Sequence, residues 1–337
     1  MTTVQAFAAH AADQPFEPFE YELPDELGHD EVEIEVISAG ICHSDLSMKL
    51  NEWGMTAYPF VGGHENVGRV VRVGDHVPNL EAGDIVGLGW FSRTCMHCDQ
   101  CMGGDHNRCL TGEGTILGRH GGFADKVRCH WSCAIPIPDG LDPLKVGPMF
   151  CGGVTAFTPF IQHNINAISR VGVIGIGGIG HMALMFGKGF GAETTAFTTS
   201  ESKADEARQL GADEVVILKD PDALTKVAGK FDMILNTANA DLDWDAYLAA
   251  LAPGGVLHTI GAVPGGFGVK QVFPMLLGHK SLSGSPVGPP VRIRRMLEFC
   301  ARHGIEPVTE NFAMDDINDA FELLHHGKPR YRVVMKR

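Results

Sequence analysis

VGVIGIGGIGHMALMFGKGFGAE, at residues 171–193, has the pattern of a buried strand, a glycine-rich turn and a helix. The apolar run at 171–174 predicts the strand, and the alanine, methionine and leucine residues after position 180 predict the helix. Between them, Gly175, Gly177 and Gly180 form the motif G-x-G-x-x-G. The first glycine permits a tight turn, the second lets the backbone approach a pyrophosphate, and the third lets the helix pack closely on the strand. The stretch therefore predicts a dinucleotide site at a helix N-terminus, with Gly178 in the same loop.

The alternation of strands and helices continues from about residue 152 to residue 284. Apolar runs predict strands at 171–175, 194–199, 214–217, 232–236, 256–260 and 281–283. Gly211 is expected to end one helix, and APGG at 252–255 is expected to form a turn before the next strand. An alternation of this kind is typical of one doubly wound parallel sheet.

The end of the second predicted strand indicates which dinucleotide binds. NAD-binding sites usually have an acid there, roughly 20 residues after the glycines, which accepts a ribose hydroxyl and repels a 2′-phosphate. The sequence here is FTTSESKADEA, at 197–207, with no acid near Thr198. The groups that suit a phosphate dianion are the hydroxyls of Thr198, Thr199 and Ser200 and the ammonium of Lys203. NADP(H) is therefore expected, although Ser200 could simply cap a helix starting at Glu201; the two roles are compatible.

The remainder of the chain has a different pattern. Residues 1–150 contain short segments rich in valine and glycine, such as EVEIEVISAG and VGRVVRVGDHV, which predict a β-rich, barrel-like domain. The tail, residues 285–337, is expected to contain helices near 290–303 and 315–326 and a final strand, YRVVMK.

Composition restricts the classes of function. A net charge of −14 argues against a nucleic-acid partner, because an acidic surface repels phosphate backbones. Apolar residues make up 44% of the 337, and no apolar run reaches the roughly 18–20 residues of a membrane span, so no membrane association is expected. The N-terminus lacks the basic start of a secretory signal, and the expected location is the cytoplasm.

Four of the nine cysteines fall within CMHCDQCMGGDHNRC, at 95–109, with the spacing C-x2-C-x2-C-x7-C. Thiols of a cytoplasmic protein stay reduced, which argues against disulfides. Four thiolates at this spacing can surround one tetrahedral zinc ion, which would be structural because no coordination position is left open. The predicted ligands are Cys95, Cys98, Cys101 and Cys109. Free or redox-active cysteines and an iron–sulfur cluster are the alternatives.

Further metal-ligand residue types occur in GICHSDLSM (40–48), VGGHENVGRV (61–70) and MFCGGVTAF (149–157), and spacing alone does not join these segments. Their order, with the cysteine-rich lobe between the second and the third, resembles the zinc-dependent medium-chain alcohol dehydrogenase family over essentially the whole chain. NEWG at 51–54, CGGVTA at 151–156 and SLSGSPVG at 281–288 are similar to its cinnamyl-alcohol-dehydrogenase-like branch, the bacterial NADPH-dependent aldehyde reductases.

The resemblance implies a catalytic zinc site with Cys42, His64 and Cys151 as ligands and one open position for water or substrate. Glu65 would lie beside the metal and enter its shell when substrate is absent, and Asp45 would accept a hydrogen bond from His64. Taken singly, Asp45 could instead be a solvated loop acid, Cys151 a small buried hydrophobe and His64 a structural histidine.

The resemblance also implies contacts with the cofactor and the substrate. Besides the glycine loop and the second strand, the implied cofactor contacts are His43, Thr155, Thr237, Gly261 and Ser283. Trp53 and Trp90 are expected to line the substrate pocket, which would favour aromatic or medium-length aliphatic aldehydes. An exposed His43 and core-packed tryptophans are the alternatives, and the other cysteines and histidines are expected to have no functional role.

Together the residues and the resemblance imply an α/β enzyme with two domains. Residues 1–150, completed by 285–337, would form a GroES-like β-rich catalytic domain with a structural zinc lobe, and residues 151–284 a doubly wound Rossmann NADP-binding domain. The enzyme would transfer a hydride between NADP(H) and a small-molecule alcohol/aldehyde pair, with one catalytic and one structural zinc ion.

The expected assembly is a homodimer or homotetramer, with VLHTIGAV (256–263), near the expected sheet edge, pairing across a two-fold axis. Two other functions remain open from the sequence. One is a zinc dehydrogenase of the same fold that acts on polyols or formaldehyde-type substrates. The other is a non-catalytic, zinc-stabilised NADPH-binding sensor.

Ser44 matches the family's first proton-relay hydroxyl, unless it is a simple turn serine, and Ser47 stands where many members have a histidine. A serine hydroxyl can pass a proton, but it does not titrate near neutrality. We therefore predict a flatter pH profile of hydride transfer between roughly pH 6 and 8 than in histidine-bearing relatives. Ser47→His should introduce a titration in this window in single-turnover measurements, and an unchanged profile would contradict the prediction.

Overall fold

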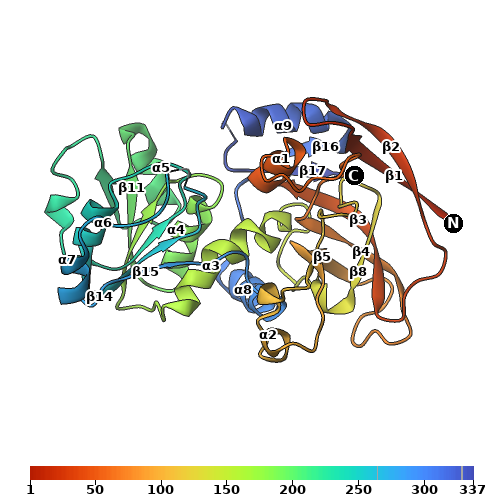
Figure 1. The fold of residues 1–337 in the computed structure, drawn as a ribbon, viewed down its shortest axis with the longest axis horizontal. Helices are drawn as coiled ribbons and strands as arrows, with labels where there is room; N and C mark the ends of the chain where they lie inside the picture. Colours follow the sequence, from red (N-terminus) through yellow and green to blue (C-terminus); the bar gives the residue numbers. More distant parts are fainter. Residues whose placement is uncertain (264, 328) are drawn as a thin grey trace. The chain divides into compact units, whose positions relative to one another are not determined.

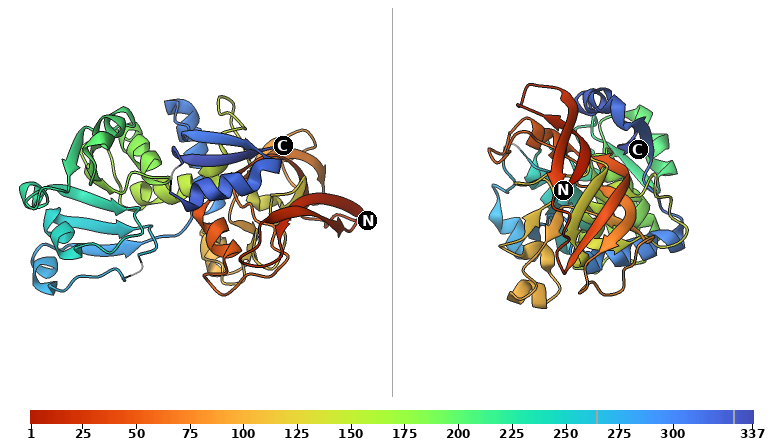
Figure 2. Two further views of the ribbon diagram at one scale, coloured as in Figure 1. Left: turned by 90° about the horizontal axis from the view of Figure 1, so that it is seen from above. Right: turned by 90° about the vertical axis from the view of Figure 1, so that its right-hand side faces the viewer.

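The structure is a computed structural model that describes residues 1–263, 265–327 and 329–337 (Figures 1 and 2). The chain divides into two compact units. Met1–Val154 and Val287–Arg337 form the first unit, and Thr155–Pro286 form the second.

The second unit is built on a six-stranded sheet in which every pair of neighbouring strands is parallel. The strand order is β12-β11-β10-β13-β14-β15. The strands are β10 (Arg170–Ile174), β11 (Glu193–Thr198), β12 (Glu214–Ile217), β13 (Phe231–Asn236), β14 (Leu251–Thr259) and β15 (Ser281–Gly284). The helices are α3 (Gly152–Gln162), which starts in the first unit, α4 (Gly180–Gly189), α5 (Ala204–Gln209), α6 (Trp244–Ala250) and α7 (Val272–Leu277), with 3-10 turns η4 (Glu201–Lys203) and η5 (Thr225–Val227). This sheet confirms the predicted Rossmann fold, and β10 to β13 begin and end within one residue of the predicted ranges.

The turn between β10 and α4 depends on its glycines. Gly175 has a φ of +84°, a conformation that favours glycine. A Cβ atom at Gly180 would lie 1.8 Å from the carbonyl oxygen of Gly175, so the start of α4 can approach the end of β10 only without a side chain there. Val171, Val173 and Ile174 of β10 are buried, as expected for a central strand covered on both faces.

The structure differs from the sequence-based expectation at β14 in two ways. The strand already begins at Leu251, so the predicted turn APGG lies inside it; the register with β13 shifts between Phe231 and Met233, and Gly254 has a φ of +78°. The glycines therefore form a bulge rather than a turn. The segment VLHTIGAV does lie near the sheet edge, in the second strand from it, but β15 lies between β14 and that edge in the described sheet, so the edge that could pair with another chain belongs to β15.

The first unit contains a seven-stranded sheet of order β16-β17-β3-β4-β5-β9, with β8 paired to β3, and two two-stranded sheets, β1-β2 and β6-β7. The strands are β1 (Thr2–Ala9), β2 (Phe16–Leu23), β3 (Glu31–Ile41), β4 (Asn66–Val73), β5 (Ile85–Leu88), β6 (Phe91–Arg93), β7 (Glu113–Gly114), β8 (Lys126–His130), β9 (Ala134–Pro136), β16 (Thr309–Ala313) and β17 (Arg332–Lys336). The helices are α1 (His43–Lys49), α2 (Asp99–Met102), α8 (Pro290–His303) and α9 (Ile317–His325), with 3-10 turns η1 (His106–Arg108), η2 (Trp131–Cys133), η3 (Gly147–Phe150) and η6 (Met314–Asp316). The core combines side chains such as Ile34, Phe123 and Phe321 from distant parts of the chain.

The tail completes the sheet of the first unit. Its last strand, β17, pairs antiparallel with β3, with Val333 opposite Ile41, and Figures 1 and 2 show the blue C-terminal strands beside the red-orange β3. Helix α8 has the predicted bounds of 290–303. Strand β16 was not predicted, because its sequence TENFA has no apolar run; it forms by parallel pairing with β17. None of the helices in the described residues is both long enough and apolar enough to span a membrane.

The two glycines Gly180 and Gly177 provide a matched test of the turn. Gly180→Ala should lower the free energy of unfolding by about 1–3 kcal/mol, because the new methyl group collides with backbone. Gly177→Ala should change it by less than about 0.5 kcal/mol, since no atom in the described part of the chain lies within 4 Å of a Cβ there. Urea unfolding of both variants measures these changes. Equal losses of the free energy of unfolding would show that the close approach at Gly180 does not require glycine.

Candidate functional site

Three distant segments of the first unit bring together Cys42, His64, Glu65 and Cys151, all buried. Each offers one ligand atom, and these atoms lie within 4.8 Å of one another. Cys42 follows β3 and caps the N-terminus of α1 in an extended conformation, while His64 and Glu65 directly precede β4. Cys151 lies between η3 and α3. The fold therefore assembles the set of residues that sequence spacing alone could not join.

A buried carboxylate orients the histidine of this cluster. Asp45 is fully buried, so it is not a solvated loop acid, and its Oδ1 lies 3.0 Å from Nδ1 of His64. The Asp45 carboxylate also accepts backbone hydrogen bonds from Cys42 (2.9 Å) and Gly63 (2.8 Å). Because an ionised carboxylate only accepts, Nδ1 carries the proton that it shares with Asp45. In the described structure Nε2 of His64 is buried without a hydrogen-bond partner.

The charges of the cluster fit a divalent cation. Hydrogen bonding with Cys151 holds the pKa of Cys42 well below its ordinary value, and the same interaction raises the pKa of Cys151. Burial acts to lower the pKa of His64, but Asp45 and the charge of Cys42 outweigh it and raise that pKa well above its ordinary value. Metal binding to cysteine and histidine requires deprotonated ligands, and a cation at this cluster would displace the protons held here. The unpartnered Nε2 and two thiols form the donor set of an open zinc site.

Arg332, which the sequence analysis did not single out, pairs with the glutamate of this cluster. Its Nη2 donates to both carboxylate oxygens of Glu65 at 2.6 Å and also contacts the Ile41 carbonyl oxygen at 3.3 Å. Burial raises the pKa of Glu65 to about 7, against the opposing charge of Arg332. The only sequence signal was a charged residue in the apolar run YRVVMK, and Arg332 lies 267 residues from its partner.

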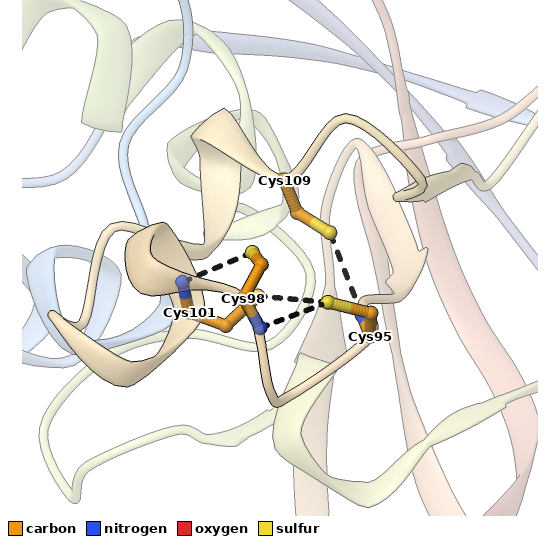
Figure 3. A group of neighbouring side chains, drawn as sticks. All are labelled: Cys95, Cys98, Cys101 and Cys109. Carbon is orange, nitrogen blue, oxygen red and sulfur yellow. Dashed lines mark hydrogen bonds between the residues drawn. The ribbon is translucent and has the colours of Figure 1, made fainter.

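The second cluster consists of the four cysteines of the lobe, drawn in Figure 3. Their ligand atoms also lie within 4.8 Å of one another, and none of the nine cysteines, all of which lie in the described residues, is in a disulfide. Backbone amides donate to three of the sulfurs: Cys98 N to Cys95 Sγ, Cys101 N to Cys98 Sγ and Cys95 N to Cys109 Sγ, at 3.4–3.5 Å. Such donors favour thiolates, and those of His97 and Cys98 lower the pKa of Cys95 to about 6. The lobe is thus arranged to hold one tetrahedral ion.

The two tryptophans that are predicted to line the substrate pocket lie beside the ring of His64. The Trp90 ring packs edge-on against His64 at 5.0 Å between centroids, and Trp53 packs against Trp90 at 6.2 Å. Trp53 is 43% exposed, so it is not an ordinary core residue. His43 is also exposed.

Helix α1 carries two serine hydroxyls, one beside the first cluster and one bound to an acid. Ser44 Oγ lies 3.8 Å from Cys42 Sγ. Ser47 is buried, and its Oγ donates to Oε2 of Glu52 at 2.6 Å. Glu52, whose role the sequence analysis missed, is exposed. Glu52 lies five residues after Ser47, just beyond the end of α1, and its backbone N–H donates to the Ser47 carbonyl oxygen at 2.9 Å.

In the second unit, the predicted cofactor residues gather at the carboxyl ends of the parallel strands. Gly175, Gly177 and Gly178 follow β10, Thr198 ends β11 and is followed by Thr199 and Ser200, Thr237 follows β13, and Gly261 follows β14. Ligands of doubly wound sheets bind at this edge. The Thr237 hydroxyl donates to the carbonyl oxygens of Ile174 (2.9 Å) and Gly175 (2.6 Å), so this side chain supports the glycine loop. Thr155 lies on α3, and Ser283 Oγ contacts His258 Nδ1 at 2.7 Å.

The end of β11 presents hydroxyl groups and no carboxylate. Thr198 Oγ1 accepts a hydrogen bond from Ser200 N at 3.1 Å. Ser200 precedes η4, but its side chain makes no capping hydrogen bond and instead contacts the hydroxyl of Ser202 at 2.7 Å, a residue missed from sequence. Lys203 ends the same turn, and Glu201 is exposed.

Breaking the Arg332–Glu65 pair should leave a buried carboxylate without a partner. Arg332→Leu is expected to lower the free energy of unfolding by about 3–5 kcal/mol. The loss should be larger at pH 8 than at pH 6. The charge of Arg332 lowers the pKa of Glu65, so the variant raises this pKa above about 7, and the variant goes on losing stability with rising pH where the wild-type carboxyl is already ionised. Urea unfolding at both pH values measures this.

Arg337→Leu is the control for that variant. The Arg337 side chain is exposed and, among the described residues, donates only to the Gln5 carbonyl oxygen, while the backbone bond to Ile37 is kept in the variant, so the substitution should cost less than about 0.5 kcal/mol. Similar losses in the two arginine variants would show that the buried pair does not hold the site together.

Comparison with known proteins identifies the family of the chain. Residues 28–139 match the family of alcohol dehydrogenase GroES-like domains, and residues 178–302 match the zinc-binding dehydrogenase family. An aldehyde reductase of Synechocystis sp. is 47% identical over 332 residues, which cover 98% of each chain.

Two solved structures extend the similarity. A cinnamyl alcohol dehydrogenase of Sorghum bicolor has a TM-score of 0.93 at 33% identity, over 99% of this chain and 98% of that one. A cinnamyl alcohol dehydrogenase of Helicobacter pylori, complexed with NADP(H), has a TM-score of 0.89 at 28% identity over the same shares. Similarity over almost the full length, in both units, shows that the chain belongs to the zinc-binding alcohol dehydrogenases, as an oxidoreductase of the cinnamyl-alcohol-dehydrogenase-like branch.

Proposed function

We propose that this protein transfers a hydride reversibly between NADP(H) and an alcohol/aldehyde pair, and that it favours reduction of aromatic or medium-chain aldehydes. The observation that carries the proposal is the buried cluster of Cys42, His64 and Cys151, in which His64 Nε2 lies beside the two thiols and makes no hydrogen bond within the described residues. A binding protein without turnover needs no such open donor set beside a relay of hydroxyls.

The proposed catalytic zinc would be held by Cys42, His64 and Cys151. Asp45 fixes the tautomer of His64 and strengthens it as a ligand. Glu65, paired with Arg332, lies next to these ligands and is available to the metal when substrate is absent. When bound, zinc supplies Lewis-acid stabilisation of negative charge on the substrate oxygen, and NADPH supplies the hydride.

A second zinc ion is proposed at Cys95, Cys98, Cys101 and Cys109. Four thiolates close its coordination shell, so this ion would order the lobe and take no part in the reaction. None of the cysteines in the described residues is in a disulfide, as expected in a reducing compartment, and we place the protein in the cytoplasm.

NADP(H) is proposed as the cofactor because the end of β11 lacks the acid that would repel a 2′-phosphate. Thr198, Thr199, Ser200 and Lys203 offer hydroxyls and a positive charge at this edge, and Ser202 adds a further hydroxyl. The NADP(H) complex of the Helicobacter pylori relative supports this choice. His43, Thr155, Gly261 and Ser283 remain proposed contacts along the cofactor.

The preference for apolar aldehydes rests on the two tryptophans. Trp90 contacts the ring of His64, and Trp53 extends this aromatic surface to solvent. Flat aromatic faces beside the proposed metal ligand favour aromatic and aliphatic substrates over polyols, whose hydroxyls would lose hydrogen bonds to water there.

A homodimer is proposed through the edge of the parallel sheet. The edge strand is β15, not the VLHTIGAV segment, and one edge of β15 lacks a neighbouring strand in the described sheet. The adjacent helix α7 exposes apolar side chains, with Phe273 at 69% and Leu277 at 70%. An unpaired edge beside an exposed apolar helix is the kind of surface that oligomers cover.

Protons are proposed to leave the site through Ser44, Ser47 and Glu52. Ser47 transmits a proton without storing it, and the exposed carboxylate of Glu52 accepts the Ser47 hydrogen bond and can exchange with solvent. A carboxylate thus takes the place that a histidine has in many relatives, which fits the flat pH profile expected from the sequence.

The first experiment combines metal content and turnover. The purified protein should contain two zinc equivalents per chain and oxidise NADPH with cinnamaldehyde or benzaldehyde, with a higher kcat/KM for NADPH than for NADH. Cys151→Ser should lose one equivalent and the activity, whereas Cys300→Ser, in α8 away from both clusters, should keep both. Full activity with a single equivalent confined to the cysteine-rich lobe would overturn the proposal.

The proton path can be tested at its solvent end. Glu52→Gln should lower kcat for alcohol oxidation by up to about 10²-fold, the lower end of general acid–base effects, because water can partly replace an exposed acceptor. The solvent isotope effect should rise, and unfolding should be unchanged because Glu52 is exposed. Glu17→Gln, an exposed acid on β2, is the control, and equal kinetics for both variants would exclude Glu52 from the path.

A further inference from the structure

Two loops of the first unit meet at the end of the β3–β4 pair that is opposite Cys42. One contains Gly28, His29 and Asp30 before β3, and the other contains Gly74, Asp75 and His76 after β4. Strand β3 has eleven residues between His29 and Cys42, so the two ends are roughly 30 Å apart. This place is therefore separate from the proposed catalytic cluster.

The backbone holds the two loops in a defined arrangement. His76 N donates to the His29 carbonyl oxygen at 3.0 Å, and Gly74 N donates to the Glu31 carbonyl oxygen at 2.8 Å. A Cβ atom at Gly74 would lie 2.2 Å from the His29 carbonyl oxygen and 2.3 Å from that of Gly28. The close approach of the loops thus requires glycine at position 74, and it fixes the backbone that carries the side chains.

Two imidazoles and a carboxylate converge above this backbone. His29 Nδ1 lies 2.5 Å from Asp75 Oδ1, and the rings of His29 and His76 stack with centroids 4.9 Å apart and planes at 22°. His29, Asp75 and His76 can each direct one ligand atom so that all three lie within 4.8 Å of one another. Asp30 is a further oxygen donor, 3.9 Å from His76 Nδ1.

We propose that His29, Asp75 and His76 form a third metal site, for a late first-row divalent cation such as Zn²⁺, Ni²⁺ or Cu²⁺. Imidazole nitrogens with one carboxylate oxygen are typical ligands of these ions, and water would complete the shell. Ligand atoms on one tetrahedral zinc ion are about 3.3 Å apart, so the side chains need to close by at most about 1.5 Å, which their exposure permits. The ion replaces the proton that His29 and Asp75 share, and that proton passes to water.

The expected consequence of binding is a clamp between the two loops. The His29–Asp75 pair alone is exposed, with side chains 72% and 69% accessible, and exposed pairs of this kind contribute little to stability. A cation that binds three residues from both loops binds only the folded chain, so it raises the unfolding temperature by mass action. The site would stabilise the first unit and leave the reaction unaffected.

The test uses zinc-loaded, untagged protein titrated with Ni²⁺ by calorimetry at pH 8, with thermal unfolding in parallel. The wild type should bind one further equivalent and gain unfolding temperature with added Ni²⁺. The double variant His29→Ala, His76→Ala should lose both effects, and Asp75→Asn should weaken binding by at least about tenfold, the smallest effect expected for loss of a metal-site group.

The control is the double variant His325→Ala, His326→Ala. These exposed rings also stack, at 5.8 Å and 17°, and Glu322 Oε2 lies 3.4 Å from His326 Nε2, but within the described residues no three ligand atoms come within 4.8 Å of one another here. The control should bind Ni²⁺ as the wild type does. With Cu²⁺, the electron paramagnetic resonance spectrum should show two coupled nitrogens that the first double variant lacks. Absence of an extra equivalent, or its persistence without His29 and His76, would overturn the proposal, and neither result depends on aldehyde reduction.

Discussion

The hydrogen bonds accepted by the buried Asp45 carboxylate hold the centre of the first unit together. The carboxylate receives the backbone N–H of Cys42 and of Gly63 and the Nδ1 proton of His64, and it has no contact with water. A buried carboxylate is tolerated only when its oxygens are satisfied, so the turn after β3 and the segment before β4 must stay together. The same bonds direct His64 Nε2 at the two thiols, which gives the oxidoreductase its open donor set.

The cluster around His64 also depends on the C-terminal tail of the chain. Strand β17 adds to β3 and brings Arg332 against Glu65, next to the ligands. Glycine at position 40 leaves room for this carboxylate, since a Cβ there would lie 2.1 Å from Glu65 Oε2. The buried pair therefore couples the last strand of the chain to residues near its beginning, and a chain that lacked its tail would lose a partner of the proposed metal site.

The candidate sites of the two units are assembled from the sequence in different ways. In the second unit, the glycine loop and the hydroxyls after β11 follow directly from strands that end at one edge of a parallel sheet, and Thr237 secures the loop from the neighbouring strand. In the first unit the cysteine-rich lobe is local and nearly complete within fifteen residues. The cluster around His64 is instead assembled from three separate segments, and its proposed proton exit ends on a residue, Glu52, outside any motif.

The sequence by itself determined what short-range patterns encode: the strands and helix around the glycine motif, the missing acid after Thr198, and the spacing of the four lobe cysteines. The family resemblance supplied the grouping of Cys42, His64 and Cys151. Only the tertiary structure decided the Glu65–Arg332 pair, the bulge in β14, the place of β15 at the sheet edge, and the meeting of His29 with His76. These features depend on contacts between residues far apart in the chain or on strand pairing, and periodicity and spacing report only on neighbours along the backbone.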